Sequence, residues 1–223
     1  MKNILFIILW LLPITLSAQE DKPINNQISL LGALDSNSAW ELDFSYMRRL
    51  TSWFGAGAGL NIYHQYSDEI TAEGAPVSGM SISQWILSDK SKRATGMQFN
   101  PFVHINTPAL FHIDDAGINI YAEPGVLMTF LSDKNVEADY WNGSGYYIMR
   151  TFDGHGGDWL FWCCRLGIAL ENDYGCLSVG YLASNTDMYS FKRNIHIDNV
   201  RLGDNLSKTH FNWAVFVNLG CKF

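Results

Sequence analysis

The sequence predicts an all-β protein, an eight-stranded antiparallel up-and-down transmembrane β-barrel. Three observations lead to this fold class. Apolar and polar residues alternate through the last stretch of the chain, 210–223, which places each set on one face of a strand. Only 17% of the residues are charged and 14% are aromatic, whereas soluble domains carry about 25% charged residues. Short connections between the expected strands also alternate with long ones.

The N-terminal segment 1–18 has the features of a secretory signal peptide. Lys2 precedes an apolar run that Pro13 interrupts, and small residues end the segment at Ala18. The apolar run is shorter than the roughly 20 residues that a membrane-spanning helix needs. We therefore expect export, removal of the signal peptide and a mature barrel domain of residues 19–223.

Eight segments follow the alternating pattern. The clearest is the last, which keeps its phase over more residues than the about 9–11 that cross a bilayer at a tilt. Single-chain outer-membrane barrels have an even number of strands, and eight fits this rule. In chain order, the expected strands are 26–34, 40–47, 54–66, 97–107, 117–131, 160–171, 175–187 and 210–223.

The third, fourth and fifth segments each contain a departure from a simple strand. Residues 55–59 read G-A-G-A-G, which looks like a phosphate-binding loop, but a strand pattern and not a helix follows them. Pro101 and Pro124 lie inside the fourth and fifth strands, and proline cannot donate to the hydrogen-bond ladder of a closed barrel. We expect β-bulges at both prolines, with Pro124-Gly125 shifting the phase of the fifth strand, or else a break in either strand.

The connections show the asymmetry of an outer-membrane barrel, with long extracellular loops and short periplasmic turns. From a periplasmic N-terminus, every second connection is a periplasmic turn, and these are short or compact. We expect the long connections to be structureless loops. The expected periplasmic turns are 51–53, 108–116 and 172–174. The expected extracellular connections are the brief 35–38 and the long 67–96, 132–158 and 188–208.

Aromatic residues fall near the expected strand ends, where the two membrane interfaces should be. Strands in general are rich in aromatic residues, so this clustering adds only a little to the prediction. The residues are Trp40, Tyr63, Tyr66, Phe130 and Trp159 at the outer ends, and Trp53, Phe54, Tyr174 and Phe223 at the inner ends.

Together, the signal peptide, the eight strands, the short inner turns and the terminal Phe223 resemble the small outer-membrane barrels of the outer membrane protein A and X type. The resemblance is architectural and covers 19–223. It implies an outer-membrane location in a Gram-negative bacterium, contact with outer-membrane lipids, and no peptidoglycan-binding domain. It also implies that the last strand is recognised by the outer-membrane assembly machinery, through Val217, Leu219, Cys221 and Phe223.

Charged residues on the inward phase of the strands predict a salt-bridge network that fills a narrow lumen. Buried charges need partners, and the interior of an eight-stranded barrel is only just filled by side chains. A catalytic carboxylate pair is the alternative, but structural ion pairs are the commoner case. The residues are Glu41, Asp43, Arg49, Glu123, Arg165, Glu171 and Lys222.

Other candidate chemistry is weak. The stretch 153–158 reads D-G-H-G-G-D and resembles an oxyanion loop, but the chain has no G-x-S-x-G nucleophile motif. His196 and Asp198 are too few and too scattered to predict a metal site. The four cysteines have neither a disulfide-framework nor a zinc spacing. We expect no catalytic residue, no metal and no cofactor, and the net charge of −7 argues against nucleic-acid binding.

The sequence thus predicts a non-enzymatic outer-membrane protein with an envelope-structural or surface-interaction role through its long loops. The aromatic segment 139–147 is the expected contact surface for an unidentified surface ligand or protein. One alternative is a lipid A-modifying enzyme that uses His104, His210 and either Ser207 or Ser178. Another is a soluble exported barrel that binds an apolar ligand in its lumen.

Overall fold

The computed structural model describes residues 26–67, 70–76, 81–145, 147–206 and 211–223. The predicted signal peptide, Ser207 and His210 lie outside these ranges. Among the described residues, no helix is long and apolar enough to cross a membrane.

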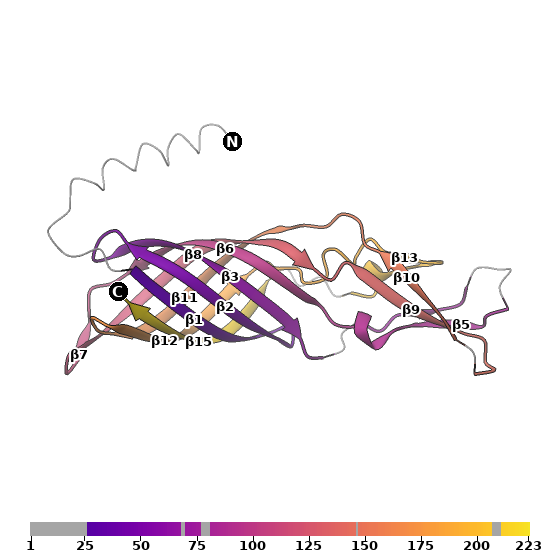
Figure 1. Ribbon diagram of the computed structural model, residues 1–223, viewed down its shortest axis with the longest axis horizontal. Helices are drawn as coiled ribbons and strands as arrows, with labels where there is room; N and C mark the ends of the chain where they lie inside the picture. Colours follow the sequence, from indigo (N-terminus) through magenta and orange to yellow (C-terminus); the bar gives the residue numbers. More distant parts are fainter. Residues whose placement is uncertain (1–25, 68–69, 77–80, 146, 207–210) are drawn as a thin grey trace, which may run out of the picture.

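Eight antiparallel strands of the described chain close into a barrel (Figure 1). Each strand pairs with the next along the chain, and the last pairs with the first, where Leu219 lies opposite Leu30. The up-and-down barrel that the sequence predicts is therefore confirmed, with strand ends that differ by a few residues. The strands are β1 (Asn26–Asp35), β2 (Ala39–Arg49), β3 (Phe54–Gln65), β6 (Thr95–Asn106), β8 (Ala116–Ser132), β11 (Leu160–Glu171), β12 (Gly175–Ser184) and β15 (Asn212–Lys222).

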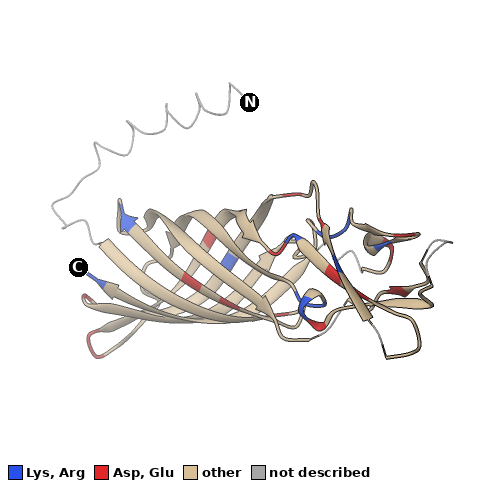
Figure 2. Cartoon of the chain, turned by 45° about the vertical axis from the view of Figure 1, so that its right-hand side comes forward, with Lys and Arg blue, Asp and Glu red and all other residues tan. Residues whose placement is uncertain are grey.

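Buried and exposed residues alternate along the barrel wall. On β1, Leu30 is 49% exposed and its neighbour Leu31 is 2% exposed; on β2, Phe44 is 56% exposed and Asp43 is 1% exposed. The outer wall is thus apolar while the interior holds polar and charged groups, and few charged residues lie along the barrel in Figure 2. A continuous apolar outer wall far exceeds the patches that soluble monomers expose, so this is a transmembrane barrel.

The two prolines lie on one seam, between β6 and β8. The bulges expected at Pro101 and Pro124 are wrong, because inward and outward residues keep their phase through both prolines and the register shift lies between Met97 and Gln98. The pairs across this seam skip both prolines, since proline has no N–H to donate. Opposite Pro101, the Val126 carbonyl accepts instead from the Asn100 side-chain nitrogen at 3.2 Å. A side-chain amide therefore replaces the missing backbone donor.

The described parts of the long connections are folded, so the expectation of structureless loops is wrong. The described residues of 66–94, 133–159 and 185–211 form what we call the head, which extends the barrel at the end opposite the C-terminus (Figure 1). Its described residues form a four-stranded sheet in the order β10-β9-β5-β4 and a small hairpin of β13 and β14. The elements are β4 (Glu73–Gly74), β5 (Gln84–Leu87), β9 (Asn135–Trp141), β10 (Tyr147–Asp153), β13 (His196–Ile197), β14 (Val200–Arg201) and the short 3-10 helices η1 (Asp89–Ser91) and η2 (Leu202–Asp204).

The head has a hydrophobic core that continues into the barrel rim through Ala39 of β2 and Tyr63 of β3. Trp85 of β5 and Val136 and Tyr140 of β9 are almost fully buried, and they belong to one cluster with Ile197 and Leu202 from the last connection. At the other end of the barrel, the connections 50–53 and 172–174 are tight turns, and 107–115 carries the short β7 (Phe111–Ile113) paired with the start of β8. The length asymmetry of the connections is therefore confirmed.

The head is hydrogen-bonded to the rim of the barrel. The Gln65 side chain, at the end of β3, is fully buried and donates to the backbone carbonyl of Asn37 at 3.1 Å. It accepts hydrogen bonds from the backbone N–H of Ala94 and from the hydroxyl of Tyr189. One amide thus connects the first, second and fourth connections on the head side.

Candidate functional site

An ion pair crosses the middle of the lumen. Arg165 of β11 lies 2.6 Å from Asp43 of β2, and both side chains are almost fully buried. Arg165 also lies 3.6 Å from Glu123, its register partner on β8, and 2.9 Å from the Asn100 side-chain oxygen. In the strand order, β2 and β11 are four strands apart in a ring of eight, so this pair spans the lumen.

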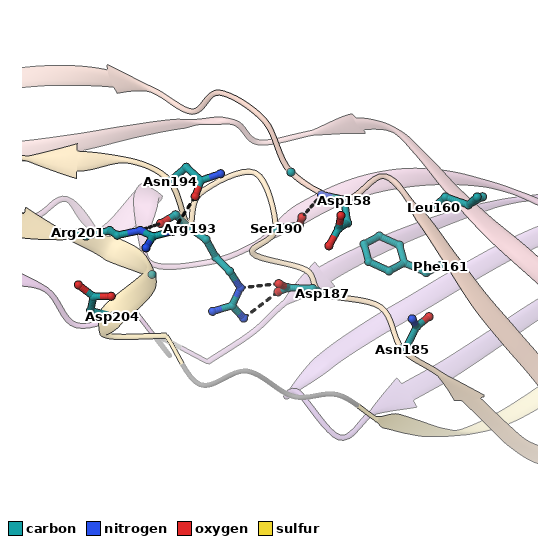
Figure 3. A pocket seen from close by; sticks show the side chains of 12 residues that line it. Asp158, Leu160, Phe161, Asn185, Asp187, Ser190, Arg193, Asn194, Arg201 and Asp204 are labelled. Atoms are coloured by element: carbon teal, nitrogen blue, oxygen red, sulfur yellow. Dashed lines mark hydrogen bonds and ion pairs between the residues drawn. The ribbon is translucent and has the colours of Figure 1, made fainter.

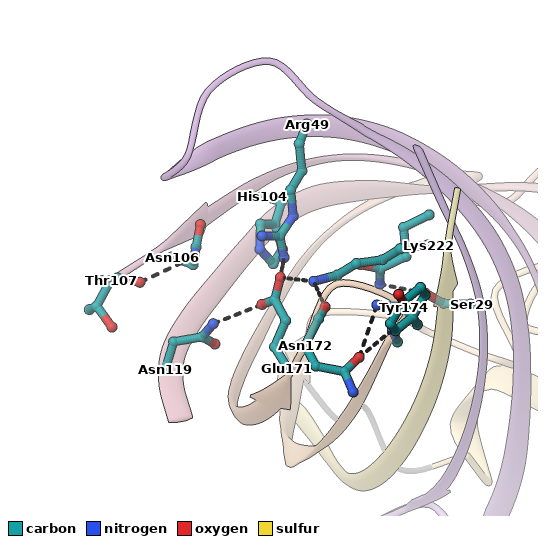
Figure 4. Close-up of polar contacts among 12 residues, drawn as sticks. Ser29, Arg49, His104, Asn106, Thr107, Asn119, Glu171, Asn172, Tyr174 and Lys222 are labelled. Carbon is teal, nitrogen blue, oxygen red and sulfur yellow. Dashed lines mark hydrogen bonds and ion pairs between the residues drawn. The ribbon is translucent and has the colours of Figure 1, made fainter. Parts of the chain in front are cut away.

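A second charged cluster lies near the short-turn end (Figure 4). Glu171 of β11 is 2.5 Å from Arg49 of β2, forms an ion pair with Lys222 of β15, and accepts a hydrogen bond from Asn119 at 2.8 Å. Lys222 also donates to the carbonyl of Asn172 at 2.6 Å. Glu171 therefore connects three barrel strands besides its own.

His104 and Glu41 do not follow the pattern that the sequence predicts. His104 of β6 lies 2.8 Å from Glu123 through Nδ1 and stacks on Tyr121, yet sequence reasoning assigned it no place among the lumen charges. Glu41, which was expected in the salt-bridge network, is buried in the lumen. It has no ion pair among the described residues and accepts a hydrogen bond from Asn61 at 3.0 Å. Amides supply much of the polar lumen, and charge counting cannot detect them.

The residues considered for a lipid A-modifying enzyme do not form a site on the outer surface. Ser178 is buried in the lumen, where its Oγ lies 2.9 Å from the Tyr121 hydroxyl. His104 is also inside the lumen, and Ser207 and His210 lie outside the described residues. The G-A-G-A-G stretch continues as β3, as predicted. No group of three or more metal-ligating side chains occurs in the described part of the chain.

The residues assigned to the assembly signal lie on the outer wall of β15 or directly after it. Val217 and Leu219 are 51% and 58% exposed, Cys221 points outward beside them, and Phe223 follows the strand. The four cysteines are free thiols in the structure.

One face of the head sheet combines exposed apolar residues with carboxylates. We call it the acidic-aromatic face. Trp141 and Tyr147, which lie opposite each other on β9 and β10, are both exposed. Met149 is also exposed, and its cross-strand partner Asp139 is partly exposed. The described residues of the four strands place no Lys or Arg on this face. Its members are Glu73, Gln84, Ile86, Asn135, Glu137, Asp139, Trp141, Tyr147, Met149, Thr151 and Asp153.

The prediction for the segment 139–147 needs a correction. Tyr140 is not a surface residue, because alternation along β9 turns it into the head core, where its hydroxyl donates to Asp198 at 2.9 Å. Burial raises the pKa of Tyr140 to about 12. Trp141 and Tyr147 are the exposed aromatic residues, and Tyr146 lies outside the described residues. The exposed face extends to β4, β5 and β10, which the sequence did not indicate.

Lys192 connects three parts of the head and has no signal in the sequence. Lys192 is only 1% exposed. Its ammonium group donates to the carbonyls of Ser91 and Arg93 at 3.3 and 3.0 Å and lies 3.1 Å from the Asp133 carboxylate. Burial lowers the pKa of Lys192. These partners are far away along the chain and follow no period, so only the folded structure brings them together.

Comparisons with known proteins give structural neighbours only. No protein-family model and no curated protein matches the chain. Neisserial surface protein A has a crystal structure similar to this chain, with 10% sequence identity and a TM-score of 0.45. The match covers 90% of this chain and 97% of the Neisserial chain. The N-terminal barrel domain of Pseudomonas aeruginosa OprF is 10% identical, covers 89% and 97%, and has a TM-score of 0.41. Ail of Yersinia pestis, in complex with the heparin analogue sucrose octasulfate, is 8% identical, covers 91% and 100%, and has a TM-score of 0.39.

The fold class follows from the chain itself. Eight antiparallel strands close on one another, the outer wall is apolar, and charged side chains occupy the interior. These features satisfy the requirement that a membrane-spanning sheet has no unpaired edge. The chain is a small eight-stranded transmembrane β-barrel of the outer-membrane type, with a folded head at one end.

Proposed function

We propose that the chain is a non-enzymatic outer-membrane protein whose barrel anchors the head at the cell surface, where the head contacts a partner. The observation that carries the proposal is the folded head, with a buried core around Trp85 and Tyr140. A barrel that served only to fill the membrane would not need a second sheet. Long connections belong to the extracellular side in such barrels, which supports an outward head.

Export and assembly follow from two segments at the chain ends. Segment 1–18 serves as the signal peptide, and β15 with Val217, Leu219, Cys221 and Phe223 serves as the signal for the assembly machinery. The exposure of these side chains on the outer wall supports this role, because an assembly factor can then contact them directly.

The lumen is structural in this proposal. Two ion pairs cross it between the opposite strands β2 and β11, and buried Phe102, Phe161 and Phe216 occupy space beside them. Paired and hydrogen-bonded charges inside the lumen hold the strands in register. A lumen filled in this way leaves no room for a wide water-filled pore. The activity therefore belongs to the head.

The acidic-aromatic face is the proposed contact surface, and its chemistry fits a basic protein partner. Trp141 and Tyr147 are the aromatic residues that dominate binding energy at protein interfaces. Glu73, Glu137 and Asp139 are carboxylates on the same face, and the described residues of the four strands place no Lys or Arg there. A partner with Lys or Arg side chains would be steered to it electrostatically.

Binding of lipid nanodiscs that contain the chain to a polylysine-coated sensor tests this proposal. The triple variant Glu73→Gln, Glu137→Gln and Asp139→Asn should bind at least fivefold more weakly than the wild type. A control with the same net charge, Asp114→Asn, Asp115→Asn and Asp173→Asn, removes exposed carboxylates at the opposite end of the barrel and should bind like the wild type. Equal losses in both variants would mean that only net charge matters, and would overturn the proposed contact surface.

A further inference from the structure

A polar cleft of about 570 Å³ lies where the head meets the barrel rim (Figure 3). Leu160 and Phe161, the first residues of β11, form one side, and Asn185 follows the end of β12. Arg201 and Asp204 come from β14 and η2 of the head. The volume falls within the range of about 300–1,000 Å³ that small-ligand pockets occupy.

The cleft is held in shape by contacts beneath its surface. Arg193 forms two hydrogen bonds with the Asp187 carboxylate, at 2.5 and 3.0 Å, so these charges neutralise each other. Gly203 packs so closely that a Cβ atom would lie 2.6 Å from the Arg193 carbonyl oxygen. Gly157, with φ of 143°, packs in the same way against the Ser190 carbonyl. The glycine-rich stretch 153–158 thus has a structural reason, since it brings Asp158 to the edge of the cleft.

Several polar groups of the cleft are left for a ligand. The carboxylates of Asp158 and Asp204 are exposed and have no ion pair or hydrogen bond within the described residues. The Asn185 side-chain oxygen accepts a hydrogen bond from the backbone N–H of Trp162 at 2.8 Å. The side-chain nitrogen of Asn185 is therefore left as a donor for a ligand. Arg201 is oriented by hydrogen bonds to the Arg193 carbonyl and the Asn194 side chain, at 3.3 and 2.9 Å.

These groups select against the commonest charged ligands. Asp158 and Asp204 outnumber Arg201, so the free groups carry one excess negative charge, which disfavours phosphate and sulfate. The described residues hold no cluster of three ligands for a metal ion. A neutral ligand that donates and accepts hydrogen bonds on one side, and presents C–H surface to Leu160 on the other, fits these groups. Carbohydrates combine these properties.

We infer that the cleft binds neutral, hydroxyl-rich hexose units. Sugar hydroxyls donate to Asp158 and Asp204 and accept from Asn185 and Arg201, and charge-assisted hydrogen bonds of this kind are the stronger ones. Leu160 also belongs to the apolar outer wall, so the cleft borders the membrane surface. The sugar can therefore come from a glycolipid of the surrounding leaflet or from a free saccharide. This inference rests on the proposed outward position of the head.

The experiment uses two probes and one matched set of variants. An array of neutral and N-acetylated oligosaccharides is probed with the labelled chain in detergent, and nanodiscs with or without lipopolysaccharide are compared by hydrogen exchange over residues 154–160 and 185–204. The variants are Asp158→Ala and Asp204→Ala, and Asp115→Asn at the other end is the control. Heat-modifiable gel mobility of each sample reports the folded barrel separately, so that loss of binding and loss of the fold are distinguishable.

Either of two results supports the inference. Array binding that falls at least tenfold in Asp158→Ala and Asp204→Ala, but not in Asp115→Asn, identifies a free saccharide. Protection that needs lipopolysaccharide and is lost in the same two variants identifies a glycolipid sugar. A folded chain that shows neither response overturns the inference, and so does tighter binding of sulfated oligosaccharides than of their neutral counterparts. The proposed outward head survives those negative results, because its test uses a different surface.

Discussion

Arg165 of β11 and Asp43 of β2 join opposite walls of the barrel across its lumen, with 2.6 Å between Nη2 and Oδ2. The same two strands are joined a second time by Arg49 and Glu171, with the charges exchanged between the strands. An arginine therefore reaches from each strand to a carboxylate on the other, Arg165 almost fully buried and Arg49 half-buried. Because breaking one partner of such a pair leaves a buried charge, these pairs strongly favour one arrangement of the barrel.

Removing one partner of the central pair should destabilise the barrel more than removing both. In Asp43→Leu, Arg165 keeps Glu123 at 3.6 Å as its ion-pair partner and the Asn100 side-chain oxygen at 2.9 Å, and we expect a loss of about 3 kcal/mol. The double variant Asp43→Leu and Arg165→Met should lose less, because no buried arginine remains. Urea unfolding in lipid vesicles measures both values. A double variant that is less stable than Asp43→Leu would contradict this account of the pair.

Charge on the outer wall should destabilise the barrel according to depth in the membrane. Val215→Arg and Leu166→Arg each place a cation on the lipid-facing side and should cost about 2–4 kcal/mol. Tyr174→Arg, in the turn between β11 and β12, is the matched control and should cost about 0–1 kcal/mol near the interface. Each variant is folded into vesicles, and its heat-modifiable gel mobility measures the fraction of folded barrel, which ranks the three variants by stability. Equal behaviour of all three variants would favour a soluble barrel.

The head should unfold without the barrel when its core is damaged. Trp85 is fully buried, so Trp85→Ala should cost about 3–5 kcal/mol of head stability. Trp141→Ala removes the same side-chain type from the exposed face and should leave the head intact. Limited proteolysis reports the head while heat-modifiable mobility reports the barrel. If both variants resist proteolysis equally, the head core does not depend on Trp85.

Head stability should rise with pH because of Lys192. Burial lowers the pKa of Lys192 in the folded head below its ordinary value near 10.5. Between those two pKa values the unfolded chain binds more protons than the folded chain, so stability increases with pH in that window. Lys192→Met removes the titration, and its urea midpoint should depend less on pH. Tryptophan fluorescence from pH 8 upward gives the comparison, and identical slopes would mean that Lys192 does not titrate in this way.

The barrel could be predicted from sequence because its signal is local. Alternation in β15 and β2 assigns each side chain to one face, and the wall then follows from strand count. The prolines misled the prediction of bulges. The side-chain amide of Asn100, an inward residue of β6, donates to the Val126 carbonyl that Pro101 leaves without a backbone donor. The head could not be predicted, because its strands are short and pair across long separations, as Gln84 does with Trp141.

The lumen shows the same division. Inward charges such as Arg165 and Glu171 are visible as breaks in an apolar alternation, and the structure brings several of them together. Their partners depend on the distance across a closed ring, which sequence spacing does not contain. Glu41 illustrates the consequence, since an amide of β3, not a cation, approaches it. The cleft beside Asp158 likewise combines residues 157–161 with residues 185–204, which are distant in the chain.

The position of each barrel end relative to the cell surface decides whether the barrel presents its head outward. One epitope is inserted at the turn between Gly143 and Gly145, where the backbone is exposed and a Cβ would meet no other atom. A second is inserted at Asp114–Asp115, in the turn after β7 at the other end. Antibody should label the first epitope on intact Gram-negative cells and the second only after permeabilisation. Labelling of the second epitope alone on intact cells, or of neither epitope, would contradict an outer-membrane barrel that presents its head outward.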